Sequence, residues 1–465
     1  MTNQIFTSKL KVIFFLLTLL ASKIGVSQTC TGPFVFSTQS EVDAFIIDNP
    51  TCTQIIGDVF IVGNAIHSVE AFHNIESIQG VLYIEGTILN NVWGFRNVRS
   101  VYSLQLINVP VFNLHGFINL QNVDFDFILA GTGNLTNLAG LYDLHTIGGS
   151  FIVSGTSISN FSGSRLISVG YFNVIGNNNI YNFNGMEYLT TIYSGMSVIN
   201  NQNLQNFNGL SDLSTINGYL YIRGNNNLIS TNGMNSLLSV KDITMIENPS
   251  LVHVDGFPNL NEANSLSLTF NPNLSTVSGF NNLNRLEYLI ISENGSLNNI
   301  SAFNRNFLVG FGIITYNLSL STCHVVSICN LIDRAPHLIT IVGNATGCWS
   351  KSEVDAQCMG SMKSDDNVQK GEDNDLNARS NFKNSDVYPI NKLLSPNPGN
   401  GIFQVKLSND VLSNLVVINI QGQAVYSANQ QQGIVNVDIS TMPSGIYMLH
   451  IQNEEGNFII KMIMN

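Results

Sequence analysis

Residues 185–209 read GMEYLTTIYSGMSVINNQNLQNFNG, and the pattern inside this stretch decides the fold. It starts at the small residue Gly185 and reaches the next small residue of the same kind at Gly209. Between them, the apolar side chains of Met196 and Val198 flank a polar residue. Apolar residues at every second position predict a short strand with one buried face.

The same unit recurs along most of the chain. Eleven small residues follow one another at steps of 22, 23 or 24 residues: Ala71, Gly94, Gly116, Gly140, Gly163, Gly185, Gly209, Gly233, Gly256, Gly279 and Ala302. Each of them is preceded by a pair of apolar residues in alternation, from Val59 and Ile61 in the first unit to Leu289 and Ile291 in the last. A fixed period in this range predicts a solenoid, whose units bury their apolar faces only by stacking. We therefore expect an all-β solenoid of about 11–12 turns with its strands aligned in a parallel sheet.

A second ladder of residues lies eight positions before the small landmarks. Its members are Asn108, Asn177, Asn201, Asn225, Asn248, Asn271 and Asn294, with Gly63, Gly86 and Gly155 at the same place and Thr132 as the exception. Asn and Gly both tolerate a left-handed backbone, so we expect the chain to turn sharply at these residues. Stacked Asn amides can also hydrogen-bond to the copies above and below them. A ligand site seldom repeats on nearly every turn, so the ladder favours a structural role.

Both ends of the predicted solenoid, residues 28–358, carry signs of a cap. Thr38 and Glu41 have the spacing of a capping box before an apolar stretch, and this predicts a short N-terminal helix. Six cysteines flank the repeats and none lies inside them: Cys30, Cys52, Cys323, Cys329, Cys348 and Cys358. We expect a Cys30–Cys52 disulfide, short helices after the last repeat, and disulfides of open pairing among the other four cysteines. A zinc site is the alternative there, but the tight Cys-x-x-Cys pair is missing.

Composition limits the possible partners. The net charge is −12 and only 11% of the residues are charged, so nucleic acid is a poor partner. Residues 1–27 have lysines before a short apolar run and small residues at its end, as in a secretory signal peptide. No later segment has the length and apolarity of a membrane span. The histidines are scattered, and we expect no metal and no cofactor.

The region from residue 52 to about 358 resembles the receptor L-domain family. The likeness rests on residues 52–57 (CTQIIG), which lead into 59–61 (VFI), and on the motif Gly-x-x-x-Leu-x-x-Ile that begins at Gly185 and again at Gly209. The resemblance implies a right-handed, leucine-rich-repeat-like β-helical solenoid that binds a ligand. The cysteine-rich modules and the membrane span of the receptors are missing here, so neither signalling nor any particular ligand carries over.

The remainder of the chain predicts a linker and a second domain. Residues 359–387 are polar and charged without apolar periodicity, which is typical of a disordered linker. Residues 388–465 resemble the C-terminal sorting domain of type IX secretion cargo. The matching residues, in order, are Pro396, Asn397, Pro398, Gly422, Gly445, Tyr447 and Lys461. The resemblance implies a bacterium of the Bacteroidetes type, a small Ig-like β-sandwich, the type IX machinery as a partner, and a passenger released or attached at the outer-membrane surface.

These patterns favour a non-catalytic binding or adhesion module for an unknown protein or glycan. A carbohydrate-active enzyme on a β-solenoid and a structural surface-layer protein are the alternatives. An enzyme needs carboxylates on adjacent turns, whereas Asp58, Asp126 and Asp242 belong to turns one, four and nine. The residue between the two buried ones of each strand must point outward. Among these outward residues, an apolar set is our candidate binding face: Phe60, Tyr83, Ile128 and Ile152.

Overall fold

The computed structural model describes residues 28–303, 307–362, 394–395, 399–407, 412–419, 424–443, 445–453 and 456–464. The chain separates into two compact units that divide between Asp366 and Asn367. The predicted signal peptide and residues 363–387 of the predicted linker lie outside the described residues.

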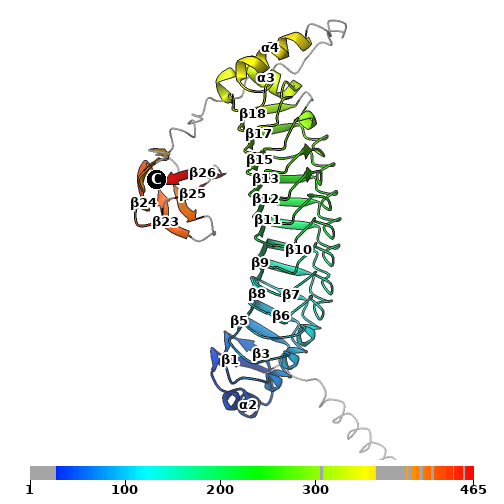
Figure 1. Cartoon of the computed structure of the whole chain (residues 1–465). Coiled ribbons are helices and arrows are strands. Elements are labelled where there is room, and N and C mark those ends of the chain that lie inside the picture. The colour runs from blue at the N-terminus through cyan, green and yellow to red at the C-terminus, as the bar shows by residue number, and fades with distance from the viewer. Residues whose placement is uncertain are drawn as a thin grey trace, which may run out of the picture. The chain divides into compact units, whose positions relative to one another are not determined.

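The first unit is a solenoid built around one parallel sheet of 17 strands (Figure 1). Its strands are β1 (Gln28–Thr31), β2 (Phe34–Phe36), β3 (Cys52–Ile56), β4 (Val59–Val62), β5 (Ser77–Glu85), β6 (Ser100–Ile107), β7 (Asn122–Val123), β8 (Phe127–Ala130), β9 (Thr146–Ser154), β10 (Ser168–Ile175), β11 (Thr191–Ile199), β12 (Thr215–Arg223), β13 (Ser239–Ile246), β15 (Ser265–Thr269), β17 (Arg285–Ser292), β18 (Leu308–Thr315) and β19 (Ile339–Val342). A minor pair, β14 (His253–Val254) and β16 (Thr276–Val277), joins two turns elsewhere. Short 3-10 helices follow some turns: η1 (Glu70–Phe72), η2 (Trp93–Phe95), η3 (His115–Phe117), η4 (Ser301–Phe303) and η5 (Pro336–Leu338).

The predicted alternation is confirmed on every turn. Both apolar residues of each of the eleven pairs are buried, from Val59 and Ile61 to Leu289 and Ile291. Strands pair in register, so that Phe172 lies beside Met196 and Met196 beside Leu220. Equivalent side chains therefore stack along the axis into one continuous core, as expected when each turn buries its apolar face against its neighbours.

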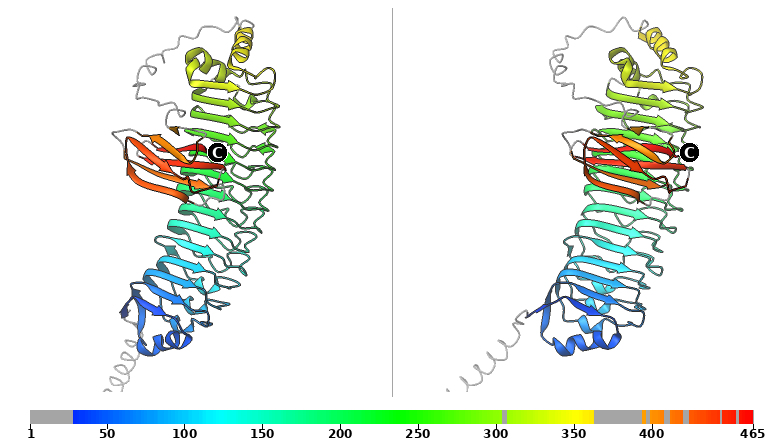
Figure 2. Two further views of the ribbon diagram at one scale, coloured as in Figure 1. Left: turned by 60° about the vertical axis from the view of Figure 1, so that its left-hand side comes forward. Right: turned by 90° about the vertical axis from the view of Figure 1, so that its left-hand side faces the viewer.

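Most strands have two segments with a bend between them. In β5 the pairing register with β6 shifts between Ile78 and Val81, at Gly80. A Cβ on Gly80 would overlap the backbone carbonyl of Gly57, so the close approach requires glycine there. We call the part before the bend the leading segment and the part after it the main segment. Figure 2 shows the strands stacked along the length of the solenoid.

The eleven small landmarks serve two kinds of turn. Gly209 has a φ of 104°, and a Cβ there would overlap the backbone of Phe183. Ala71 and Ala302 instead lie in 3-10 helices, where the backbone accepts an L side chain. Gly94 and Gly116 also lie in 3-10 helices, but a Cβ there would overlap the carbonyl oxygens of Val69 and Val92, so close packing requires glycine at these two positions.

The predicted stacking of Asn side chains between turns is confirmed. The predicted left-handed backbone is wrong for most of these residues. The left-handed residue is usually the one before the Asn: Gly176, Asn200, Gly224, Glu247, Phe270 and Glu293 precede the six Asn from Asn177 to Asn294. Of the predicted positions, Gly86, Asn108 and Gly155 do have positive φ. The six later Asn instead turn inward and are fully buried, and Asn317 and Asn344 continue their row.

Hydrogen bonds connect each buried Asn to the next. Asn201 Oδ1 accepts from the backbone N–H of Asn177 at 3.0 Å and from its Nδ2 at 3.2 Å. Asn201 Nδ2 donates to the carbonyls of Val174 at 2.9 Å and Ile199 at 3.2 Å. The same bonds join all eight residues of the Asn ladder, which runs from Asn177 to Asn344. Every polar atom of these buried amides is satisfied, as burial requires.

Caps close both ends of the solenoid. Helix α2 (Gln39–Asp48) begins with the predicted capping box: Thr38 accepts from Glu41 N–H, and Glu41 accepts from Thr38 N–H. Cys30 pairs with Cys52, as predicted. At the other end, α3 (Val326–Arg334) and α4 (Lys351–Met362) are tied down by the Cys323–Cys348 and Cys329–Cys358 disulfides. Helix α4 continues four residues into the predicted linker, which begins at Met359.

The second unit contains two antiparallel sheets. One has the order β20-β21-β24 and the other β23-β22-β25-β26. Their strands are β20 (Leu394–Ser395), β21 (Ile402–Lys406), β22 (Ser413–Asn419), β23 (Ala424–Gln431), β24 (Ile434–Asp438), β25 (Gly445–Asn453) and β26 (Gly456–Met464). Phe403 from one sheet and Val417 and Leu449 from the other are buried in a shared core. This arrangement is the predicted small β-sandwich.

Candidate functional site

The predicted binding face is a real ladder on the main segments. Phe60 pairs with Tyr83, and their rings lie 6.0 Å apart between centroids. Ile128 pairs with Ile152, and Gln105 separates the two pairs. All four predicted residues are half-buried because each packs against its neighbour along the ladder. That these side chains contact a ligand stays a prediction.

Tyr83 has a polar partner on the same face. Its hydroxyl donates to Glu85 Oε2 at 2.6 Å. This hydrogen bond to a carboxylate raises the pKa of Tyr83 above its ordinary value, with smaller contributions from desolvation and charge. The phenol therefore stays neutral at physiological pH, and its ring carries the apolar contact with Phe60.

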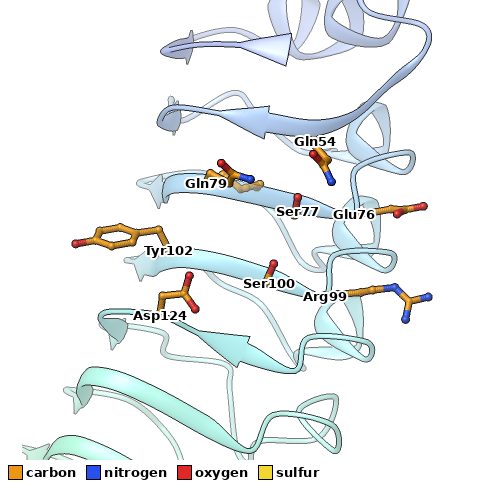
Figure 3. Close-up of a pocket in the computed structure, with 9 residues that line it drawn as sticks. Gln54, Glu76, Ser77, Gln79, Arg99, Ser100, Tyr102 and Asp124 are labelled. Atoms are coloured by element: carbon orange, nitrogen blue, oxygen red, sulfur yellow. The ribbon is translucent and has the colours of Figure 1, made fainter. Parts of the chain in front are cut away.

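A groove lies on the leading segments of the same N-terminal turns. It has a volume of about 550 Å³ and is open to solvent. It is lined by Gln54, Glu76, Ser77, Ile78, Gln79, Arg99, Ser100, Tyr102 and Asp124 (Figure 3). The sequence interpretation missed the groove because the longer side chains that line it differ in type from turn to turn, although Ser77, Ser100 and Ile78 occupy repeated positions.

Strand register gives the groove its shape. Gln54 pairs with Ser77, and Ser77 pairs with Ser100, so these three residues form a column along the solenoid axis. The serines are short, and longer side chains stand on either side of them (Figure 3). Glu76 and Arg99 precede the column residues of their turns and lie on one side. Gln79, Tyr102 and Asp124 follow it and lie on the other side. The column of serines is therefore the floor of the groove and the longer residues are its walls.

The polar side chains of the groove are not used by the fold. Within the described residues, none of these side chains hydrogen-bonds to, or forms an ion pair with, another protein group. Ser77 Oγ is shielded from solvent and has no partner among the described residues, as is also true of Thr87 Oγ1, Thr132 Oγ1 and His324 Nδ1 away from the groove. An unsatisfied hydroxyl costs stability, by about 1–3 kcal/mol when fully buried. The groove therefore keeps hydrogen-bonding capacity that folding does not consume.

An aromatic pair forms part of one wall. Tyr102 stacks on Phe125 with ring centroids 5.6 Å apart and an interplanar angle of 10°. The two residues are 46% and 48% exposed. The contact holds the Tyr102 ring in a defined orientation while leaving much of it accessible, which is how aromatic anchors at binding sites are arranged.

The aspartates considered for catalysis have structural partners instead. Asp58 Oδ1 accepts from Val81 N–H at 2.8 Å, and Asp126 Oδ1 accepts from Ser150 N–H at 2.7 Å. Each holds the bend of the next strand. Asp242 accepts from Ser265 Oγ at 2.6 Å, and burial raises the pKa of Asp242 above its ordinary value.

The described part of the chain contains neither a metal-binding cluster nor a membrane-spanning helix. It holds no group of three or more His, Cys, Asp or Glu side chains placed to bind a metal ion. Nor does it include a helix with the length and apolarity needed to cross a membrane.

The predicted sorting residues lie in or near the strands of the second unit. Tyr447 is buried in β25, and its hydroxyl donates to the Pro443 carbonyl at 2.6 Å. Gly445 begins β25 and Lys461 belongs to β26. Pro396, Asn397, Pro398 and Gly422 lie outside the described residues.

Fold and site together define a disulfide-bonded β-solenoid joined to a small β-sandwich. Residues 394–465 match the secretion system C-terminal sorting domain family. The solenoid matches no receptor L-domain or leucine-rich-repeat family. No curated protein matches the chain. The sorting domain is that of the type IX system, and it marks the protein for export to the cell surface or the extracellular space.

Proposed function

We propose that the exported solenoid is a recognition module that binds a ligand without transforming it, and that the groove on its first turns is the binding site. The observation that carries this proposal is the set of groove side chains without protein partners. The Asn ladder, in contrast, satisfies every polar atom of its buried amides. Polar groups left unpaired beside an exposed aromatic pair are typical of a surface that meets a ligand.

The positions of the acidic residues support binding rather than catalysis. Glu76 and Asp124 lie two turns and three residue positions apart, about 14 Å between Cα atoms for standard strand spacings. Their side chains point to opposite sides (Figure 3). Glycosidases place their paired carboxylates roughly 5–10 Å apart across the bond that they cleave. Asp126, two positions after Asp124, is nearer, but its Oδ1 accepts from Ser150 N–H and so holds the next strand.

The receptor L-domain resemblance agrees with this proposal. Those domains are solenoids that bind ligands, and the stack of parallel strands within residues 52–358 supports a solenoid as the binding module. An adhesive role at the cell surface follows from combining such a module with a sorting domain.

The test is a binding array. The full mature chain is applied to immobilised glycans and proteins beside an Arg99→Ala/Tyr102→Ala variant whose thermal melt matches wild type. We expect at least one immobilised component to bind the wild-type protein and not the variant. If every bound component holds both proteins equally, the groove is not the site. If mass spectrometry showed that a bound component is converted to a product, this result would contradict the non-catalytic role.

A further inference from the structure

Resting on the proposed function above, we infer that the groove binds a neutral, extended glycan chain that lies parallel to the solenoid axis, with Tyr102 stacking on one sugar ring. The floor of the groove indicates the orientation of the bound chain. The floor residues Gln54, Ser77 and Ser100 repeat once per turn along the axis, so a ligand that uses all of them must run the same way.

The repeat distance of the groove suits a polysaccharide. Neighbouring strands lie about 4.8 Å apart, so each turn offers a new set of hydrogen-bonding groups at that interval. This interval is close to the length of one sugar unit in an extended β-1,4-linked chain. From Gln54 to Asp124 the groove covers three such intervals, or about 14 Å. Three to four sugar units fill that length.

The chemistry of the walls matches sugar hydroxyls. Gln54 and Gln79 offer amides, Glu76 and Asp124 offer carboxylates, and Arg99 offers a guanidinium group. Such planar groups can engage two neighbouring hydroxyls at once. The Tyr102 ring, supported by Phe125, supplies an apolar surface for the C–H face of a pyranose ring. Polar side chains for orientation beside one aromatic surface are the combination that a hydroxyl-rich ring requires.

Charge and topology argue against other ligands. The groove contains two carboxylates against one guanidinium group, and the chain as a whole has a net charge of −12. A polyanion such as a uronic acid polymer or nucleic acid would be repelled. An extended peptide that adds a strand needs a free sheet edge. Strand β5 is paired on both sides, with β3 and with β6, so the floor offers no such edge.

The chain itself provides a matched control for Tyr102. Tyr193 follows Thr191 by two positions, as Tyr102 follows Ser100, and is 57% exposed. It therefore occupies the same place on a later turn. Four turns separate the two tyrosines, about 19 Å along the axis. An oligosaccharide of three units or fewer, about 14 Å long, that contacts Tyr102 cannot reach Tyr193.

The experiment titrates the full mature chain with neutral β-1,4-linked gluco-, xylo-, manno- and chito-oligosaccharides of two to eight units. The affinity should rise with length up to about four units and then level off, because further units pass beyond the groove. Tyr102→Ala should weaken binding roughly tenfold or more, as when an aromatic anchor is truncated. Tyr193→Ala should leave the affinity within about twofold of wild type, since it removes no contact of a short ligand. A tetragalacturonate probe should bind more weakly than the best neutral tetrasaccharide.

The possible outcomes separate the inference from the proposed function. If the array yields a protein ligand that needs Arg99 and Tyr102 while no oligosaccharide binds, the glycan inference is wrong and the recognition function stands. If oligosaccharides bind equally to wild type and Tyr102→Ala, the groove is not their site and the inference is overturned. If neither array nor titration finds a ligand, both fail.

Discussion

The turns before Gly155 and the turns after it share one strand geometry but differ in what fills the corner where the strand ends. After Gly155, every turn from Asn177 to Asn344 buries an Asn amide whose hydrogen bonds join it to its neighbours. Before Gly155, the equivalent buried residues are Thr87, Val109 and Thr132. The hydroxyls of Thr87 and Thr132 have no partner among the described residues.

Under the proposed function, the difference means that one repeat serves two purposes. The later turns are joined by interior hydrogen bonds in addition to the strand ladder. The early turns lack them, and the same turns carry the groove with its unpaired side chains. In a solenoid each turn contacts only its neighbours, so stability and recognition can be concentrated in different turns.

The largest effect is expected from breaking the Asn ladder at its centre. Asn225→Leu removes the acceptor of Asn201 N–H and the donor to the carbonyls of Val198 and Arg223. These buried groups stay unsatisfied, so the loss in unfolding free energy should be about 4 kcal/mol. Urea unfolding followed by circular dichroism measures it.

The matched change in the early turns is Thr132→Val. It replaces a buried hydroxyl that has no partner among the described residues, so stability should change by less than about 1 kcal/mol in either direction. Equal losses for Asn225→Leu and Thr132→Val would show that the two regions do not differ in the way proposed here.

The next effect concerns the left-handed turns. Gly209→Ala adds a Cβ that overlaps the backbone of Phe183 at a residue whose φ is 104°. Steric and backbone strain together should lower stability by about 3 kcal/mol. Ala71→Gly is the control, because its turn already accepts a Cβ; it should cost about 1 kcal/mol or less. Thermal melts of both variants measure these losses. A melting midpoint of Gly209→Ala equal to that of wild type would contradict the assignment of a tight turn.

The smallest expected effect is at the boundary between the early turns and the Asn ladder. Thr156 is the last residue before the Asn ladder, and its backbone N–H and hydroxyl both donate to Asn177 Oδ1. Thr156→Asn should extend the ladder by one turn and raise stability by about 1 kcal/mol, the net worth of a typical added hydrogen bond. A gain in the urea midpoint is expected, and a loss would mean that the early turns cannot accommodate the amide.

The strands and the caps could be predicted because their signals are local and repeated. Alternation at Met196 and Val198 fixes which face is buried, and the Thr38–Glu41 spacing fixes where α2 begins. The left-handed position could not be predicted, since Glu247 and Phe270 adopt it against their ordinary preference. The buried amide that follows each of them holds the backbone there, so tertiary hydrogen bonds override the local propensity.

The groove escaped prediction for a different reason. Tyr102 and Asp124 are far apart in sequence and belong to no periodic set, so only the pairing register brings them together. The disulfide pairs after the last repeat depended in the same way on how α3 and α4 pack. Register and helix packing are properties of the assembled stack, which one sequence does not reveal.

The position of the Asn ladder also has a mechanical consequence. Under the proposed function, and for a passenger that stays attached to the cell through its C-terminal end, a ligand held on the first turns would place the solenoid under tension. Because the turns are connected in series, the whole load crosses every interface between neighbouring turns from the groove to the tail. The amide hydrogen bonds run between turns, in the direction of that load. In that arrangement the Asn ladder would reinforce the turns between the proposed binding site and the C-terminal end of the solenoid.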